Sequence, residues 1–137
     1  MFLHFIQSKE HKEAFMDLAQ LVAKADGYIS GNEERYLQSF RNEMNMEVDM
    51  KQSASERNLS DIIESIKDEQ VKNIFMVEIL LLVFSDGDYS EDEQQIVLEM
   101  KRIFGISDET YDSYKKWVIR VEQLKVEGLK LILNPTA

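Results

Sequence analysis

Asp86-Gly87-Asp88-Tyr89-Ser90-Glu91-Asp92-Glu93 has the features of a corner between two helices. Gly87 can adopt the left-handed conformation that ends a helix. Ser90 and Glu93 have the spacing of a capping box, in which each side chain accepts a hydrogen bond from a free backbone N–H at the next helix's start. The same Asp-Gly-x-x-Ser-x-x-Glu pattern occurs sixty residues earlier, in Asp26-Gly27-Tyr28-Ile29-Ser30-Gly31-Asn32-Glu33. The chain therefore carries one helical corner twice.

The similarity between the halves continues on both sides of the corner. At an offset of sixty residues, Phe15 aligns with Phe75, and Asn45 aligns with Gly105, two residue types that tolerate left-handed backbone geometry. We therefore predict an all-α, compact helical bundle of about six to seven helices with an internal pseudo-twofold repeat. We expect the 137 residues to form one domain, 1–137, with repeat halves at about 10–50 and 69–110.

Apolar residues at three- and four-residue steps locate the individual helices. The expected helices cover about 9–26, about 36–44, 61–67 after a Ser60 cap, 69–85 after an Asp68 cap, a segment that Gly105 ends, and about 108–133 after a Ser107 cap. The run 79–84 is apolar almost all round, so its helix should lie at the centre of the bundle. The buried stripe of the last helix is expected to comprise Tyr111, Tyr114, Trp117, Val118, Val121 and Leu124.

Composition limits the classes of partner. The net charge of −10 would repel a phosphate backbone, so we expect no nucleic-acid partner and favour cations or basic protein surfaces. The chain has no cysteine, which excludes disulfides and thiolate zinc sites. Its apolar runs are too short to span a membrane, and the apolar run at residues 1–6 is too short for a signal peptide. We therefore expect a cytoplasmic protein.

The acidic residues of the corners are candidate metal ligands. An aspartate in the last turn of a helix meets the negative end of the helix dipole, at a cost of roughly 0.3–1 kcal/mol. Residues 86–93 hold five acids and no Lys or Arg, and two such charges about 4 Å apart repel by about 4 kcal/mol at an effective dielectric of 20. A divalent cation, Ca²⁺ or Mg²⁺, would relieve this repulsion. The candidate ligands are Asp86, Asp88 and Glu93, with Asp26 and Glu33 as a weaker second set.

A structural interpretation competes with the metal site. The same residues make an ordinary helix–helix corner, in which the acids are solvated and the serine cap contributes about 1 kcal/mol. An EF-hand is excluded, because Val97 stands where that loop needs its bidentate glutamate. His4 and His11 are the only histidines, and we assign no metal or catalytic role to either.

The doubled corner resembles the TerB-like family associated with tellurite resistance. The residues that carry the resemblance are Ala25 to Ser30 with Glu33, and Ser85 to Ser90 with Glu93, and the likeness extends over about residues 10–125. It implies an all-α fold with internal duplication, a link to bacterial stress response, and divalent-metal binding by Asp26, Glu33, Asp86 and Glu93. The domain also occurs in DnaJ-like membrane cochaperones, whose His-Pro-Asp tripeptide is absent from this sequence.

Two functions follow from these patterns. The first is a non-enzymatic TerB-like module that responds to a divalent metal or binds a protein partner. The second is an interaction scaffold whose acidic turns are structural caps only, with a locally basic last helix for docking. No nucleophile–base spacing or phosphate-binding glycine loop indicates an enzyme.

Overall fold

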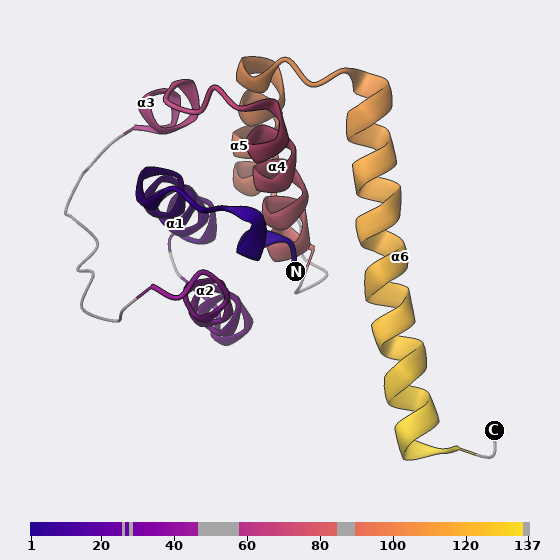
Figure 1. The fold of residues 1–137 in the computed structure, drawn as a ribbon. Helices are drawn as coiled ribbons and strands as arrows, with labels where there is room; N and C mark the ends of the chain where they lie inside the picture. The colour runs from indigo at the N-terminus through magenta and orange to yellow at the C-terminus, as the bar shows by residue number, and fades with distance from the viewer. Residues whose placement is uncertain (26, 28, 47–57, 85–89, 136–137) are drawn as a thin grey trace.

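All regular structure in the described residues is helical (Figure 1). The computed structural model describes residues 1–25, 27, 29–46, 58–84 and 90–135. These residues form a short 3-10 helix and six α-helices, which confirms the predicted all-α class. The elements are η1 (Leu3–Phe5), α1 (Lys9–Ala23), α2 (Gly31–Glu43), α3 (Leu59–Glu64), α4 (Glu69–Val83), α5 (Glu91–Phe104) and α6 (Asp108–Leu133).

Local capping chemistry fixes most of the helix starts. The Asp68 side chain accepts a hydrogen bond from Val71 N–H at the start of α4, and Ser107 accepts one from Thr110 N–H at the start of α6, each at 3.1 Å. The expected Ser60 cap is wrong, because Asn58 caps α3 by accepting a 2.9 Å bond from Asp61 N–H. Asn is as good a cap as Ser, and the earlier start brings Leu59 into the helix, where it packs against the core.

α4 occupies the centre of the bundle, as its apolar sequence predicts. It packs against α1, α5 and α6, and its residues from Phe75 to Val83 are buried except for half-buried Val77. Four phenylalanine rings link the helices through edge contacts: Phe15 of α1 lies 5.1 Å from Phe40 and 5.2 Å from Phe75 between ring centroids, and Phe75 lies 6.4 Å from Phe104. Such pairs contribute about 0.5–1.5 kcal/mol each beyond burial.

The helices of the two predicted halves start at matching positions, since α2 and α5 begin sixty residues apart. α1 and α4 begin sixty residues apart and end sixty residues apart. After α2, Asn45 has φ 55°, and after α5, Gly105 has φ 71°, so both lie in the left-handed region. The next N–H then bonds back across the helix end in both halves, from Met46 to the Arg41 carbonyl at 2.9 Å and from Ile106 to the Lys101 carbonyl at 3.0 Å. The two helix ends therefore use the same closing geometry.

α6 is longer than the core against which it packs. Its 26 residues extend about 39 Å, whereas the 15 residues of α4 extend about 22 Å. Tyr111 and Val118 are buried, but Leu124 is 64% exposed, so its expected place in the buried stripe is wrong. Periodicity places Leu124 near the face of α6 that packs on the core, but at this residue α6 already extends beyond the end of α4. We call residues 122–133 the distal segment (Figure 1).

Candidate interaction surface

The two motif glutamates form the predicted capping boxes. Glu33 N–H donates to Ser30 Oγ at 3.1 Å, while Glu33 Oε1 accepts from Ser30 N–H at 3.0 Å. Glu93 and Ser90 repeat the arrangement at 3.1 and 3.2 Å. Both glutamates are buried, with 5% and 4% exposure. Each carboxylate thus uses Oε1 to satisfy a backbone donor at a helix start.

The three predicted aspartate ligands lie outside the described residues. These are Asp26, Asp86 and Asp88, so their relation to Glu33 and Glu93 has no structural description. In the part of the chain that is described, no three His, Asp or Glu side chains are grouped closely enough to hold a metal ion. The metal site therefore stays a prediction.

The first turn of α5 suggests a second reason for its acidity. Glu91, Asp92 and Glu93 all lie in that turn, and the first two are exposed. The free N–H groups of a helix start carry a partial positive charge, so acids there contribute roughly 0.3–1 kcal/mol each. Part of the acidic density near this corner is consequently accommodated by α5 itself.

An acidic pair that the sequence analysis missed holds the N-terminal segment against the bundle. Glu78 of α4 is 1% exposed, and its Oε1 accepts a 2.6 Å hydrogen bond from Phe2 N–H and lies 3.2 Å from the Met1 amino nitrogen. Glu43 of α2 accepts from the Met1 amino group at 2.6 Å and from His4 N–H at 3.2 Å. Glu78 interrupts an apolar run, and an acid in such a run usually has a partner.

Burial and hydrogen bonding move the pKa values of this pair in opposite directions. Burial raises the pKa of Glu78, and the Phe2 N–H and Met1 amino group only partly oppose the rise. Burial also acts to raise the pKa of Glu43, but hydrogen bonds from the Met1 amino group and His4 outweigh it, so this pKa lies below its ordinary value. The pair anchors η1, whose Leu3 is completely buried.

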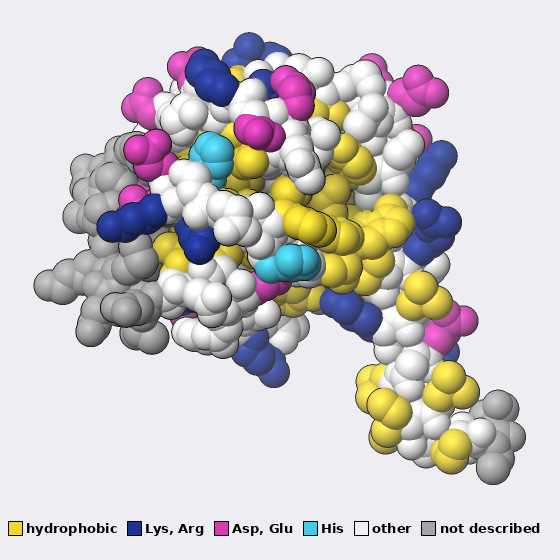
Figure 2. All heavy atoms as spheres, in the orientation of Figure 1, with side chains coloured by type: hydrophobic (Ala, Val, Ile, Leu, Met, Phe, Trp, Pro, Cys, Tyr) yellow, Lys and Arg dark blue, Asp and Glu magenta, His cyan; other side chains and the backbone are white. Residues whose placement is uncertain are grey.

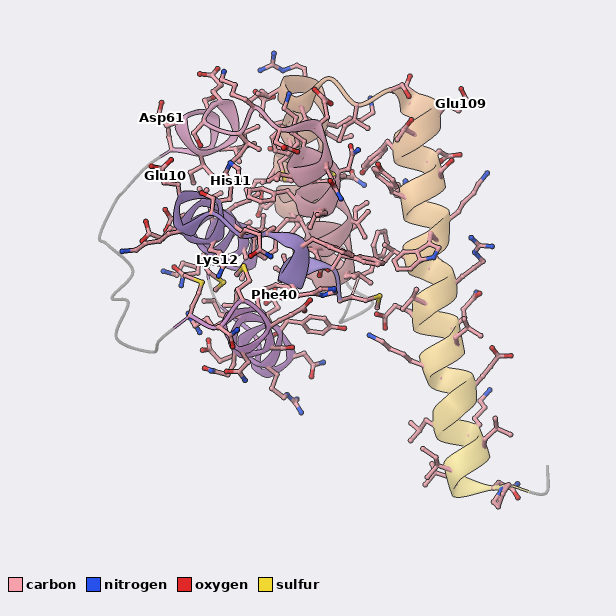
Figure 3. All side chains as sticks on the ribbon, viewed as in Figure 1. Glu10, His11, Lys12, Phe40, Asp61 and Glu109 are labelled. Atoms are coloured by element: carbon pink, nitrogen blue, oxygen red, sulfur yellow. The ribbon has the colours of Figure 1, made fainter. Side chains whose placement is uncertain are left out.

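Among the described residues, neither histidine belongs to an acidic cluster suited to a metal. His4 Nδ1 lies 3.3 Å from Glu43 Oε2, and its side chain is 57% exposed. His11 lies in the first turn of α1, between Glu10 and Lys12 (Figure 3), where its N–H donates to Ser8 Oγ at 3.4 Å. These positions are consistent with structural surface roles.

The distal segment holds most of the large apolar side chains that are exposed in the described part of the chain. Its exposed apolar side chains run from half to three-quarters exposed: Leu124 64%, Val126 52%, Leu129 54%, Leu131 59%, Ile132 78% and Leu133 75%. Figure 2 shows these hydrophobic atoms gathered around the free end of α6. Exposed apolar side chains that gather at one place, unlike single scattered ones, mark candidate interaction sites.

Lys125 connects α6 to α2 through its side chain. Its Nζ donates to Tyr36 Oη of α2 at 3.1 Å and lies 5.6 Å from that ring's centroid. It also pairs with Glu122 at 3.4 Å. Burial acts to lower the pKa of Lys125, but Tyr36 and Glu122 outweigh it and the pKa is raised. Lys116 pairs with Asp112 at 3.3 Å, so the basic face expected for this helix is partly neutralised within α6.

A groove runs beside the fastened part of α6 and into the distal segment. It has a volume of about 550 Å³ and is lined by Phe84 at the end of α4 and by Ile119, Glu122, Gln123, Val126, Glu127 and Lys130 of α6. A second depression lies among α1, α3 and α5, with Leu21, Leu59, Ile96 and Leu98 among its walls and Asp92, Glu99 and Arg102 on its polar side. The first groove is continuous with exposed apolar surface, so it is the better candidate for docking.

Comparison with known proteins assigns no family to the chain. No known family, curated protein or solved structure gives a significant match to it. Of the helices in the described residues, none combines the length and the apolar character needed to cross a membrane.

Proposed function

We propose that this chain is a non-enzymatic TerB-like interaction module that docks a protein partner on the distal segment of α6. The observation that carries the proposal is the exposure of six large apolar side chains on one end of one helix. The rest of α6 has a partner in α4. Burying the exposed part of these side chains is the principal favourable term available for association.

Helix energetics support the same interpretation. Isolated helices shorter than about 12–15 residues are marginal in water, and most helices depend on tertiary packing. Residues 126–133, the last eight residues of α6, extend past the Lys125–Tyr36 contact, and their exposed apolar side chains supply little tertiary packing to stabilise this end of the helix. A partner that covers their apolar side chains would supply the missing packing.

The TerB-like part of the proposal rests on internal duplication. The helix ends that match at an offset of sixty residues, the two capping boxes and the two left-handed residues support it. So does the contact between Phe15 and Phe75, which are equivalent in the two halves and whose ring centroids lie 5.2 Å apart. Equivalent residues meet in this way near the axis of a pseudo-twofold bundle.

A divalent-metal function at the Asp-Gly turns is the second candidate, favoured by the acidic density of residues 86–93. Thermal shift with Ca²⁺, Mg²⁺, Mn²⁺ and Zn²⁺ tests it, because a ligand at one hundred times its Kd stabilises by about 2.7 kcal/mol. Asp86→Asn should remove the gain, and Asp61→Asn, an exposed acid in the first turn of α3, should retain it. A melting temperature unchanged by millimolar metal would refute divalent-metal binding at these turns.

In-cell photo-crosslinking tests the docking function. A crosslinking amino acid replaces Leu129 in one strain and Arg120 in another; nine residues separate the two, which puts them on opposite faces of α6. We expect discrete protein adducts from position 129 and few from position 120. Adducts of equal yield from both positions, or none from position 129, would refute the proposal.

A further inference from the structure

We propose that the occupant of the distal segment is a second copy of this chain, bound antiparallel along α6. This inference rests on the proposed docking function and names its partner. It begins from the spacing of Ile119, Val126 and Leu133, which recur every seven residues, with Glu122 and Leu129 at the intervening positions. Steps of three and four residues place these five side chains, called the seam below, on one side of the helix.

The two ends of the seam have complementary shapes. At the Ile119 end the seam lines the groove beside Phe84, where about 550 Å³ is open. At the Leu133 end the helix stands clear of the bundle, and Leu129 and Leu133 are 54% and 75% exposed (Figure 1). One surface therefore offers both a groove and a projecting apolar ridge.

A twofold axis at Val126 brings these ends together. Ile119 and Leu133 each lie seven residues from Val126, about 10 Å along the helix. Antiparallel pairing about that residue places the projecting end of each copy in the groove of the other. Such a contact is isologous: each copy uses the same surface, and the assembly closes as a dimer instead of growing.

Charge placement favours the antiparallel pairing over a parallel one. Glu122 and Lys130 each lie four residues from Val126, on opposite sides of it. Antiparallel pairing therefore brings Glu122 of one copy level with Lys130 of the other. A parallel, in-register pair would instead bring glutamate against glutamate and lysine against lysine, which is unfavourable.

The charge of the distal segment also favours a second copy of the chain over an anionic lipid surface. Its two acids, Glu122 and Glu127, balance its two bases, Lys125 and Lys130. A helix that binds anionic lipid usually carries an excess of Lys and Arg on its polar face, and the net charge of −10 on the chain would oppose such a surface. Because its acids and bases balance, the distal segment can pack against an identical segment without net charge repulsion.

Analytical ultracentrifugation over roughly a hundred-fold range of concentration tests the pairing, since a seam this short gives a concentration-dependent interface. Wild type should pass from monomer to dimer. Val126→Glu, at the axis, should weaken association at least ten-fold. Arg120→Glu, at an exposed position that lies outside the distal segment and opposite Leu129 on the helix, should leave it within about two-fold. Circular dichroism checks that each variant keeps its helices.

A charge exchange tests the register. Glu122→Lys and Lys130→Glu should each weaken the dimer, because like charges then lie level across the axis, and the double variant should restore it. A wild type that is monomeric throughout, equal losses from the Val126 and Arg120 variants, or no restoration in the double variant would overturn the proposal. A monomeric wild type that still forms adducts from position 129 with another protein overturns the second copy alone. A monomeric wild type that forms no protein adducts from position 129, including one that binds vesicles of anionic lipid, overturns the docking function as well.

Discussion

Glu78 provides the sharpest test of how the N-terminal segment is held. Its carboxylate is 1% exposed, and it accepts the Phe2 N–H at 2.6 Å. Glu78→Ala removes that acceptor, and a buried donor left without a partner costs about 1–3 kcal/mol of unfolding free energy. Glu78→Gln keeps an oxygen at the same reach and a similar volume, so it should cost less than the alanine variant at neutral pH.

The pH dependence of these variants has a definite sign. Burial raises the pKa of Glu78 above its ordinary value of 4.5, so the folded state holds this proton more tightly than the unfolded state does. The stabilisation is full below the unfolded pKa and is lost as pH rises through the folded pKa. Gln has no such loss. The stability of Glu78→Gln relative to wild type should therefore improve as pH rises from about 4 towards 7.

Urea denaturation followed by the fluorescence of Trp117, the only tryptophan, measures these differences. Its ring lies 5.7 Å from Phe2 between centroids, so it reports on the segment in question. Glu43→Gln serves as the matched control with the opposite sign: the pKa of Glu43 is lowered, so its stabilisation is lost as pH falls. If the unfolding free energy of Glu78→Gln instead fell relative to wild type as pH rose, burial would not dominate the pKa of Glu78 and the reasoning would be refuted.

Four further substitutions test the helix ends and the core by thermal or urea unfolding. Ser30→Ala and Ser90→Ala should each cost about 1 kcal/mol, since each removes the acceptor for a glutamate N–H; a negligible cost at either site would contradict the capping boxes. Gly105→Ala should cost about 1–2 kcal/mol because alanine is strained at the φ of 71°; an added Cβ meets no neighbour within 4 Å, so no steric clash adds to this cost. A neutral result would contradict the left-handed closure. Phe15→Ala should cost about 3–5 kcal/mol, because it empties the junction with Phe40 and Phe75; a loss below 1 kcal/mol would show that the rings are not packed as described.

Helix starts were largely predictable because a cap acts within three residues. Ser90 with Glu93 and Ser107 with Thr110 are short-range pairs, and the structure confirms both caps. Asn58 shows the limit of this reasoning: two good capping residues stood two positions apart, and the packing of Leu59 decided between them. Local chemistry identifies candidates, whereas tertiary contacts select one.

The features missed depend on long-range geometry. Glu78 meets the backbone of Phe2 across 76 residues of sequence, a pairing that no local pattern contains. Leu124 lies near the apolar side of its helix, but periodicity does not state where the neighbouring helix ends. The same limit concealed the distal segment, whose leucines and isoleucine look like core residues until the length of α4 is known.

Amide hydrogen exchange along α6 tests the docking function most directly. The dilute chain and the chain with its crosslinked partner (another copy or a different protein) are compared residue by residue. We expect amides 126–133 to exchange rapidly in the dilute chain and at least ten-fold more slowly with the partner, while the buried centre of α4 changes little. Amides 126–133 that are already protected in the dilute chain, or that exchange equally fast with the partner present, would contradict a docking role for the distal segment.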